Sequence, residues 1–557
     1  MKAMTLREEL QKIINGEVAD DEETIAKYSK DYSIFEVRPQ TVVFPRDEQD
    51  IKKLVAFAQR ERSRERSISI TARSAGTCMS GGPLSDSIVV VFTRHLNKLK
   101  ELKKLNDEEG YAVVQPGMYY RDFEKKTLKK GLILQSYPAS REICAVGGMV
   151  ANGGGGENSL RYGKTEKFVQ ELKVVLHDGK EYAFRPLRQA ALAKKMAARG
   201  LEGEVYRTMF KITEENYELL QKAKPRVSKN SAGYALWDIW DKDKKVFDLT
   251  KLFVGSQGTL GIITEIKFRL MRPYPYSTLL VIFLKDIKPL PRIVERILEC
   301  GPESFESYDD KTLKLALRFL PGFIRLLKGN IFSLAWQFLP EFKMFLTGGM
   351  PKLVLFAEFA GDDEQETRKQ AEAAEATLQD LGLDTRITKS QKEVQKYFTV
   401  RRESFKLLHE HAKNRRTVPF IDDIVVAPEY LPEFFPRLQA ILKPYSKYMI
   451  YTVAGHVGDG NFHIIPLMDM RKQKSREIIP EVMEKVHSLI FKYKGSFTGE
   501  HNDGLIRSPY LKDMYGQKVY KLFEETKRLF DPDGIFNPRK KVGATVQYAL
   551  DHIISEN

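Results

Sequence analysis

The stretch Gly147-Gly148-Met149-Val150-Ala151-Asn152-Gly153-Gly154-Gly155-Gly156 decides the fold of this 557-residue chain. Six of its ten residues are glycine. Glycine loses more backbone entropy on folding than any other residue and weakens helices and strands, so the segment is either disordered or packed closely on something. The apolar, strand-like residues 169–176 follow and favour order. We therefore predict a glycine-rich loop whose backbone lies against a ligand.

Two other segments share this character. Arg73-Ser74-Ala75-Gly76-Thr77-Cys78-Met79-Ser80-Gly81-Gly82 follows an alternating strand, and its small residues and arginine suit a pyrophosphate. It lacks the Gly-x-Gly-x-x-Gly spacing and precedes a strand rather than a helix, so a plain turn between strands is the alternative. Residues 253–264 form the third segment, before the alternating strand 265–270. Three glycine-rich segments next to β-strands predict that one long, phosphate-bearing ligand lies along them.

Histidines and carboxylates concentrate in two segments, Gly455-His456-Val457-Gly458-Asp459-Gly460-Asn461-Phe462-His463 and Gly499-Glu500-His501-Asn502-Asp503-Gly504. Each follows an apolar run, and histidine and glutamate at the end of a buried element suit a divalent metal or a proton transfer. For each histidine taken alone, the alternative is a satisfied core or loop residue.

The spacing makes two geometric predictions. Residues seven apart in a straight strand face opposite sides, so His456 and His463 converge only if the backbone turns at residues 458–460, which glycines permit. Adjacent Glu500 and His501 should diverge, one toward a metal and the other toward a different partner.

Composition narrows the class of protein. Hydrophobic residues make up 42% of the chain and charged residues 30%, as in an ordinary soluble globular protein. The net charge of +15 suits an anionic substrate, an anionic cofactor, a membrane surface or nucleic acid. The basic residues are scattered, with no platform of aromatic and basic residues, so we expect no nucleic-acid binding.

The three cysteines, Cys78, Cys144 and Cys300, are far apart and odd in number. They predict a reducing, cytoplasmic compartment and no disulfide framework. No CxxC motif is present for an iron–sulfur cluster. The charged first twenty residues predict no secretory signal, and no run of eighteen apolar residues could span a membrane.

Residues 311–352 combine many apolar residues with seven lysines or arginines and a single acid, Glu341. Pro321, Pro340 and Pro351 divide the segment. A basic, amphipathic segment of this kind can lie on an anionic bilayer. The alternative is an insertion packed on the sheet or on a partner subunit.

The three glycine-rich segments, in this order, resemble the FAD-binding domain of the vanillyl-alcohol-oxidase/p-cresol-methylhydroxylase (PCMH) flavoprotein superfamily. The histidine motifs resemble its 2-hydroxyacid dehydrogenase branch, which includes D-lactate dehydrogenases, glycolate oxidase flavoprotein subunits and D-2-hydroxyglutarate dehydrogenases. Asp531-Pro532-Asp533-Gly534-Ile535-Phe536-Asn537-Pro538 is similar to the C-terminal signature of that family.

The resemblance implies an α+β fold in three parts. Residues 1–275 would form a PCMH-type FAD-binding domain of two subdomains. Residues 276–500 would form a substrate-binding cap domain on an antiparallel, ferredoxin-like sheet, interrupted by the insertion 311–352. Residues 501–557 would return to pack on the FAD domain.

The resemblance also implies the site residues. Non-covalent FAD is expected because no histidine lies in residues 73–82. The implied FAD contacts are Arg73, Ser74, Ala75, Gly76, Thr77, Ser80, Gly81, Pro138, Ser140, Gly147, Gly148, Ala151, Asn152, Gly154, Tyr162, Gly163, Gly258, Gly261, Ile263 and Asn537. His456, His463 and Glu500 would hold a divalent metal, zinc or manganese. His501 would take the hydroxyl proton, and Arg402 would bind the substrate carboxylate, with a solvated arginine as the alternative.

The implied reaction oxidises a small anionic D-2-hydroxy acid, such as lactate, glycolate or 2-hydroxyglutarate, to the 2-oxo acid, with hydride passing to flavin N5. Electrons would go on to a quinone, an electron-transfer flavoprotein or an iron–sulfur protein, from the cytoplasm or the inner face of the membrane. Two segments bear on the substrate: residues 421–424 depart from the 2-hydroxyglutarate enzymes, where a lysine is expected, and residues 502–508 resemble members with an iron–sulfur partner. A non-redox or alkyl-transferring flavoprotein, an oxygen-using oxidase and a scaffold with empty loops are the alternatives.

Overall fold

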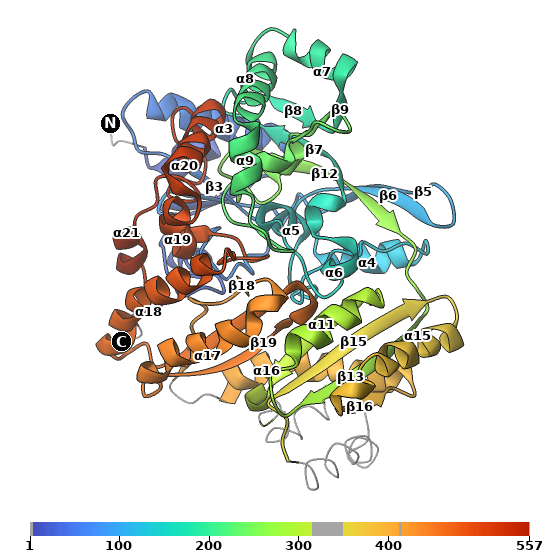
Figure 1. The fold of residues 1–557 in the computed structure, drawn as a ribbon. Coiled ribbons are helices and arrows are strands. Elements are labelled where there is room, and N and C mark those ends of the chain that lie inside the picture. The colour runs from blue at the N-terminus through green and yellow to red at the C-terminus, as the bar shows by residue number, and fades with distance from the viewer. Residues whose placement is uncertain (1–3, 313, 315–348, 412–414, 556–557) are drawn as a thin grey trace.

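A computed structural model of the chain describes residues 4–312, 314, 349–411 and 415–555 (Figure 1). For residues 402–411 the description covers the backbone only. Most of the segment 311–352 lies outside the described residues, so both alternatives for it remain open. No helix in the described part is long and apolar enough to cross a membrane.

The N-terminal half contains a four-stranded sheet in the order β1 (Glu17–Ala19), β2 (Thr41–Phe44), β4 (Ile88–Val91), β3 (Ile70–Arg73). β2, β4 and β3 run parallel. The sequences of β2 and β4, TVVF and IVVV, are buried throughout, as expected for parallel strands covered on both faces. Helix α3 (Glu48–Arg62) contributes its apolar face to the same core, and the Asp47 side chain caps its first amides.

A second sheet in this half is antiparallel, in the order β5 (Leu99–Lys104), β6 (Glu109–Val114), β12 (Ile262–Met271), β7 (Val169–Val175), β8 (Glu181–Phe184). Burial alternates along β12, which confirms the predicted alternating strand at residues 265–270. A small sheet joins β10 (Trp240–Asp241), β11 (Val246–Phe247) and β9 (Leu187–Arg188). The helices of this half are α1 (Leu6–Gln11), α2 (Glu22–Tyr28), α4 (Tyr120–Leu128), α5 (Val146–Asn152), α6 (Ser159–Tyr162), α7 (Gln189–Met196), α8 (Leu201–Glu215), α9 (Tyr217–Ala223) and α10 (Thr250–Phe253).

The predicted loop at residues 147–156 is a loop only in its second half. The first half is helix α5, which Gly153 ends with a positive φ of 59°. Gly147 is needed inside this helix for space: a Cβ there would lie 2.4 Å from the Pro116 side chain. Close packing of the helix on a neighbouring turn, which composition does not reveal, outweighs the low helix propensity of glycine.

The second half of the chain is built on an antiparallel sheet in the order β16, β13, β15, β14, β19, β20, β17, with β18 also paired to β20. The segment β13 (Tyr276–Leu284), α11 (Leu290–Glu299), β14 (Ser304–Asp309), β15 (Leu353–Gly361), α15 (Glu364–Ala376), β16 (Asp384–Ile387) forms a βαββαβ unit. Its strand order is fourth, first, third, second, which confirms the ferredoxin-like arrangement. Helix α15 packs on β13 and β15, as Figure 1 shows.

The remaining elements widen this sheet and close the chain. They are α16 (Gln391–His411), β17 (Arg416–Thr417), β18 (Ile424–Val425), α17 (Leu431–Leu442), β19 (Met449–His456), β20 (Asn461–Met468), α18 (Gln473–Lys492), α19 (Gly504–Arg507), α20 (Leu511–Phe530) and α21 (Val546–Asp551). The C-terminal segment returns to the first half. Asn537 donates to the carbonyls of Gly82 (3.0 Å) and Gln257 (2.6 Å), and the buried Lys541 donates to the carbonyls of Ser231 (3.1 Å) and Gly233 (2.7 Å).

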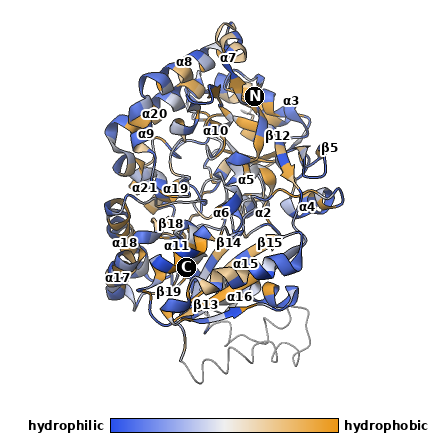
Figure 2. Cartoon of the chain, turned by 45° about the vertical axis from the view of Figure 1, so that its right-hand side comes forward, coloured by the Kyte–Doolittle hydropathy of each residue, from blue (hydrophilic) through white to orange (hydrophobic). Residues whose placement is uncertain are grey.

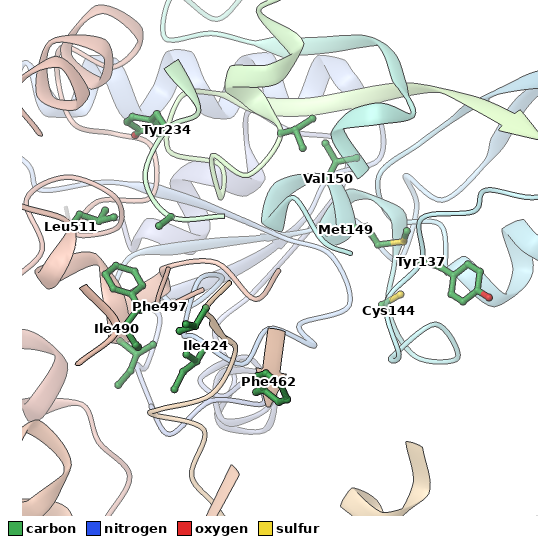
Figure 3. Packing of buried hydrophobic residues seen from close by; sticks show 14 of the residues in the cluster. Tyr137, Cys144, Met149, Val150, Tyr234, Ile424, Phe462, Ile490, Phe497 and Leu511 are labelled. Carbon is green, nitrogen blue, oxygen red and sulfur yellow. The ribbon is translucent and has the colours of Figure 1, made fainter. Parts of the chain in front are cut away.

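One large hydrophobic core runs through both halves. Figure 3 shows part of it, with Met149 and Val150 of α5 and, in the same view, Ile424, Phe462 and Phe497 from the second half. Hydrophobic residues concentrate on inner strands such as β12 and β13, while the outer helices are mixed (Figure 2). The two halves therefore bury a continuous apolar interior, and the polar site described next lies between them.

Candidate active and metal site

A tight hairpin brings two of the predicted histidines together. β19 ends at His456 and β20 begins at Asn461, joined by a turn in which Gly460 has a φ of 62°. A Cβ on Gly460 would lie 2.0 Å from the Val426 carbonyl oxygen. The ring centroids of His456 and His463 are 5.4 Å apart. The predicted turn at residues 458–460 and the convergence of the two histidines are confirmed.

Three histidines surround one oxygen of Glu500. The Nε2 atoms of His456, His463 and His501 lie 3.2, 3.4 and 4.0 Å from Glu500 Oε1. The ring of His501 stacks on that of His463, with centroids 5.0 Å apart. The prediction that Glu500 and His501 diverge is wrong. The backbone turns sharply here, with Asn502 at a φ of 68°, and both side chains reach one cluster.

Each of these histidines has its other ring nitrogen on a buried carboxylate. His456 Nδ1 lies 2.6 Å from Glu306 Oε1. Asp422 serves two rings: its Oδ1 is 3.2 Å from His463 Nδ1 and its Oδ2 is 2.5 Å from His501 Nδ1. A carboxylate on Nδ1 fixes the tautomer and orientation that leave Nε2 free as a ligand, the usual arrangement around protein-bound metals. These residues fit a divalent cation beside Glu500. The group whose ligand atoms all lie within 4.8 Å of one another consists of Asp423, His463, Glu500 and His501 and does not include His456.

Asp423 lies in the same cluster but makes different contacts. Its ligand atoms and those of His463, Glu500 and His501 lie within 4.8 Å of one another. Its Oδ2 already accepts from the Thr498 hydroxyl (2.6 Å) and from the backbone amides of Glu500 (2.9 Å) and His501 (2.7 Å). Its Oδ1 accepts from Asn461 at 3.0 Å. These four bonds make Asp423 the support of the Glu500–His501 turn.

Two buried cations complete the cluster. Lys229 Nζ lies 3.3 Å from Glu500 Oε2 and 3.1 Å from Asp459 Oδ2. Arg401 Nε lies 2.5 Å from Glu306 Oε2, and one of its terminal nitrogens is 3.4 Å from His456. Among the described side chains, Arg401 thus contacts the carboxylate and the imidazole of the cluster. The predicted substrate-binding residue, Arg402, is the next residue of α16, and its side chain lies outside the described residues.

The pKa shifts follow from this crowding. Burial alone would lower the pKa of His463, but its bonds to Asp422 and Glu500 prevail and raise the pKa to about 10. The pKa of His501 is raised because attraction by Asp422 and Asp423 exceeds the cost of burial. Burial opposes ionisation of Glu500, yet Lys229 and His456 hold its pKa well below the usual range. A divalent cation bound at these imidazoles would therefore have to displace protons from them.

The three glycine-rich segments meet beside this cluster. The amides of Gly255 and Gln257 donate to the carbonyls of Val150 and Ala151, both at 2.9 Å. Ser74 Oγ lies 3.1 Å from the Pro116 carbonyl oxygen, on the turn that packs against Gly147. Asn502, next to the histidine motif, donates to the carbonyls of Asn152 (2.8 Å) and Gly255 (2.9 Å).

The place where the three glycine-rich segments meet has the features of an FAD-binding site, which we call the FAD cradle. A Cβ on Gly148 would contact only Ser74 Cβ, at 3.7 Å, and a Cβ on Gly258 would contact only Ala72 Cβ, also at 3.7 Å, so both backbones border open space. Within the described residues, the backbone amides from Ala75 to Met79 make no hydrogen bond. Free amides and uncovered glycines suit a pyrophosphate and a flat ring.

The other residues predicted to contact FAD lie in or next to the glycine-rich segments, and their contact with FAD stays a prediction. Arg73 is buried below its loop, where it donates to the Tyr28 and Lys30 carbonyls (3.3 and 2.7 Å). Gly261 and Ile263 are at the start of β12, where Gly261 packs on Val174. Three of the remaining predicted contacts, Thr77, Ser80 and Gly81, lie in the first segment. Pro138 and Ser140 precede α5 and Gly154 follows it, while Tyr162 ends α6 and Gly163 follows that helix. Asn537 binds the Gly82 and Gln257 carbonyls.

Sequence reasoning missed several members of the cluster. Glu306 and Lys229 lie 150 and 271 residues from the partners they contact, and no local pattern signals them. Asp422 and Asp423 had a signal: two adjacent acids inside the apolar run of residues 418–426. An acid pair in a buried segment requires partners, here histidines and amides.

Comparison with known families agrees with the fold and the cradle. The family described as "FAD binding domain" matches residues 39–184. The family described as "FAD linked oxidases, C-terminal domain" matches residues 275–541. FAD is therefore the cofactor that the N-terminal half is built to bind.

Curated relatives cover most of this chain. A D-2-hydroxyglutarate dehydrogenase of Pseudomonas putida is 29% identical over 533 residues, which are 94% of this chain and 50% of the relative. The chain thus spans about half the length of that relative and of similar ones. Glycolate oxidase subunit GlcD of Bacillus subtilis is 25% identical, with 91% and 89% of the two chains covered. A D-lactate dehydrogenase of Archaeoglobus fulgidus is 25% identical, with 90% and 91% covered.

Solved structures share the architecture. p-Cresol methylhydroxylase with bound substrate superposes with a TM-score of 0.66 at 15% identity, covering 96% of both chains. An alkyldihydroxyacetonephosphate synthase superposes with a TM-score of 0.64 at 15% identity, covering 94% of this chain and 83% of the other. These likenesses establish the PCMH-type fold. The two family matches, over residues 39–184 and 275–541, place the chain among the FAD-linked oxidases.

Proposed function

We propose that this chain is an FAD-linked oxidoreductase that converts a small 2-hydroxy acid to the 2-oxo acid with the help of a divalent metal. The observation that carries the proposal is the convergence of three imidazole Nε2 atoms on Glu500 Oε1, beside the FAD cradle. The names of the relatives, which act on D-2-hydroxyglutarate, D-lactate or glycolate, support this substrate class.

In this proposal His456, His463 and Glu500 hold the metal, zinc or manganese. Two imidazoles and a carboxylate form a ligand set that leaves positions open for a substrate. Glu306 and Asp422 orient the two imidazoles through Nδ1. Asp423 stays outside the ligand set because its oxygens already accept four hydrogen bonds.

The remaining polar residues accept the hydroxyl proton of the substrate and bind its carboxylate. When bound, the metal acidifies the substrate hydroxyl and FAD takes up the hydride from the adjacent carbon. His501 Nε2 accepts the hydroxyl proton, since its Nδ1 is held by Asp422. Arg402 binds the substrate carboxylate, and Arg401 fixes Glu306 and His456.

We extend the proposal to organisation and partners. Residues 1–275 form the FAD domain, 276–500 the cap and 501–557 a segment that returns to the FAD domain, as the contacts of Asn537 with Gly82 and Gln257 and of Lys541 with Ser231 and Gly233 support. Reduced FAD passes its electrons to a quinone, an electron-transfer flavoprotein or an iron–sulfur protein. The protein acts in the cytoplasm, at the inner face of the membrane if residues 311–352 bind lipid.

An anaerobic titration tests the reaction. Purified protein with FAD and zinc or manganese is mixed in turn with D-lactate, glycolate and D-2-hydroxyglutarate, and the flavin absorbance is recorded. The proposal predicts bleaching with at least one acid and formation of the matching 2-oxo acid. Yellow protein that no 2-hydroxy acid bleaches contradicts it.

A further inference from the structure

Lys229 is a buried lysine that reaches the metal carboxylate from the FAD-binding half. It is 1% exposed and precedes the segment Asn230–Gly233, which packs on the histidine motif: the Ser231 amide donates to the Thr498 carbonyl at 3.0 Å. Its Nζ lies 3.3 Å from Glu500 Oε2, 3.1 Å from Asp459 Oδ2 and 3.3 Å from the Gly156 carbonyl oxygen. A single ammonium thus serves two carboxylates and a backbone carbonyl.

The two oxygens of Glu500 face different surroundings. Oε1 faces the three imidazoles. Oε2 faces Lys229 and the glycine-rich segment, where a Cβ on Gly155 would lie 2.8 Å from it. Glycine at this position lets the backbone of the FAD-binding half close over Oε2. One oxygen therefore points into the metal site, while the second is covered by a cation and by backbone.

We infer that Lys229 is a positioning residue that restricts Glu500 to binding the metal through one oxygen. This inference rests on the proposed function, because it takes the metal site from there. Carboxylates bind cations through one oxygen or through both, and a second bond would use a coordination position that the substrate hydroxyl needs. Because the Lys229 ammonium pairs with Oε2, Glu500 binds the metal through Oε1 alone. Lys229 itself takes up no coordination position of the metal.

Lys164 provides a matched control because it contacts the segment that follows Lys229. It is also buried, at 7% exposure, and its Nζ donates to the carbonyls of Gly153 (3.2 Å) and Asn230 (2.7 Å) and to Ser231 Oγ (2.9 Å). No carboxylate pairs with Lys164 within the described residues. Replacing Lys164 disturbs the same packing as replacing Lys229 but leaves the Glu500 oxygens as they are.

The test is zinc K-edge X-ray absorption of the zinc-loaded holoprotein, together with zinc affinity from a competing chelator. The wild type should show a four- or five-coordinate zinc without the close carboxylate carbon of a two-oxygen chelate. Lys229→Met should gain one oxygen and that close carbon. It should also bind zinc about tenfold more tightly, because a neighbouring cation is lost and a chelate bond gained. Lys229→Arg and Lys164→Met should give the wild-type spectrum.

Three results would overturn the inference while the proposed metal site stands. A chelating Glu500 in the wild type contradicts it directly and needs no variant. An unchanged zinc environment in Lys229→Met contradicts it while leaving the proposed metal site intact. Weaker zinc binding by Lys229→Met, with the same coordination, indicates a purely structural role. If the wild type binds no zinc or manganese, the proposed function fails together with the inference.

Discussion

Asp422 Oδ2 lies 2.5 Å from His501 Nδ1, and the other oxygen of the same carboxylate lies 3.2 Å from His463 Nδ1. Asp422 is 1% exposed and its pKa is lowered: burial opposes ionisation, but His501 and His463 outweigh it. In our account His463 is a metal ligand and His501 the proton acceptor. One buried anion therefore orients both, and both functions should suffer when it is lost.

Asp422→Asn is expected to lower metal affinity and the rate of flavin reduction, each by about 10- to 100-fold. The amide can donate as well as accept, so it no longer selects the tautomer with a free Nε2 on both rings. Metal content and single-turnover flavin bleaching measure the two effects. Asp86→Asn, at an exposed Arg539 pair, should match the wild type. Loss of only one function in Asp422→Asn would contradict the shared role.

His501→Gln should keep FAD and the metal but slow flavin reduction by about 100- to 10,000-fold, the usual contribution of a positioned base. The glutamine cannot accept the hydroxyl proton. Stopped-flow reduction by the active 2-hydroxy acid measures the rate, and elemental analysis measures the metal. A variant that reduces its flavin at the wild-type rate would remove His501 from the base role.

Metal affinity should rise as the pH rises. The pKa of His463 is raised to about 10, so without metal its imidazole carries a proton at neutral pH. A metal at His463 must displace its proton, and this cost falls as the pH approaches 10. Zinc binding from pH 6 to 9, followed with a competing chelator, should tighten steadily. An affinity independent of pH would contradict the ligand role of His463.

A half-buried acid, Glu358, should make stability depend on pH. Burial, and then repulsion by Glu157 and Glu303, raise the pKa of Glu358 to about 7. Because the folded protein then binds more protons than the unfolded chain, Glu358 reduces stability as the pH rises from 4.5 through about 7. Glu358→Gln should therefore raise the melting temperature at pH 8 and leave it nearly unchanged at pH 4.5. An equal change at both pH values would contradict this reading.

The sequence carried enough information for the strands and for the hairpin of the site. Alternating burial along β12 and the glycines between His456 and His463 both follow from local periodicity and turn chemistry. Local rules also suggested a loop where α5 forms, because they do not include the close approach of Gly147 to Pro116. Helix α5 forms because it packs closely on a turn that is distant in the sequence.

Two residues that support the site, Glu306 and Lys229, could not be predicted from local sequence patterns. Glu306 lies in β14, whose six residues are all buried, and nothing in the sequence SFESYD indicates a partner in β19. Lys229 reaches Glu500 only because the two halves pack together. Histidines on one hairpin can be predicted to converge from their spacing, and an acid pair in an apolar run signals buried partners, whereas isolated residues such as Glu306 and Lys229 carry no such signal.

The rate of anaerobic flavin reduction, measured before and after metal removal, tests the central claim most directly. The holoprotein is mixed with the 2-hydroxy acid that bleaches it, then treated with a chelator, and finally reloaded with zinc or manganese. Our account predicts rapid bleaching, near-complete loss after chelation with FAD still bound, and recovery on reloading. Bleaching at an unchanged rate in metal-free protein would contradict a metal at His456, His463 and Glu500 as part of the reaction.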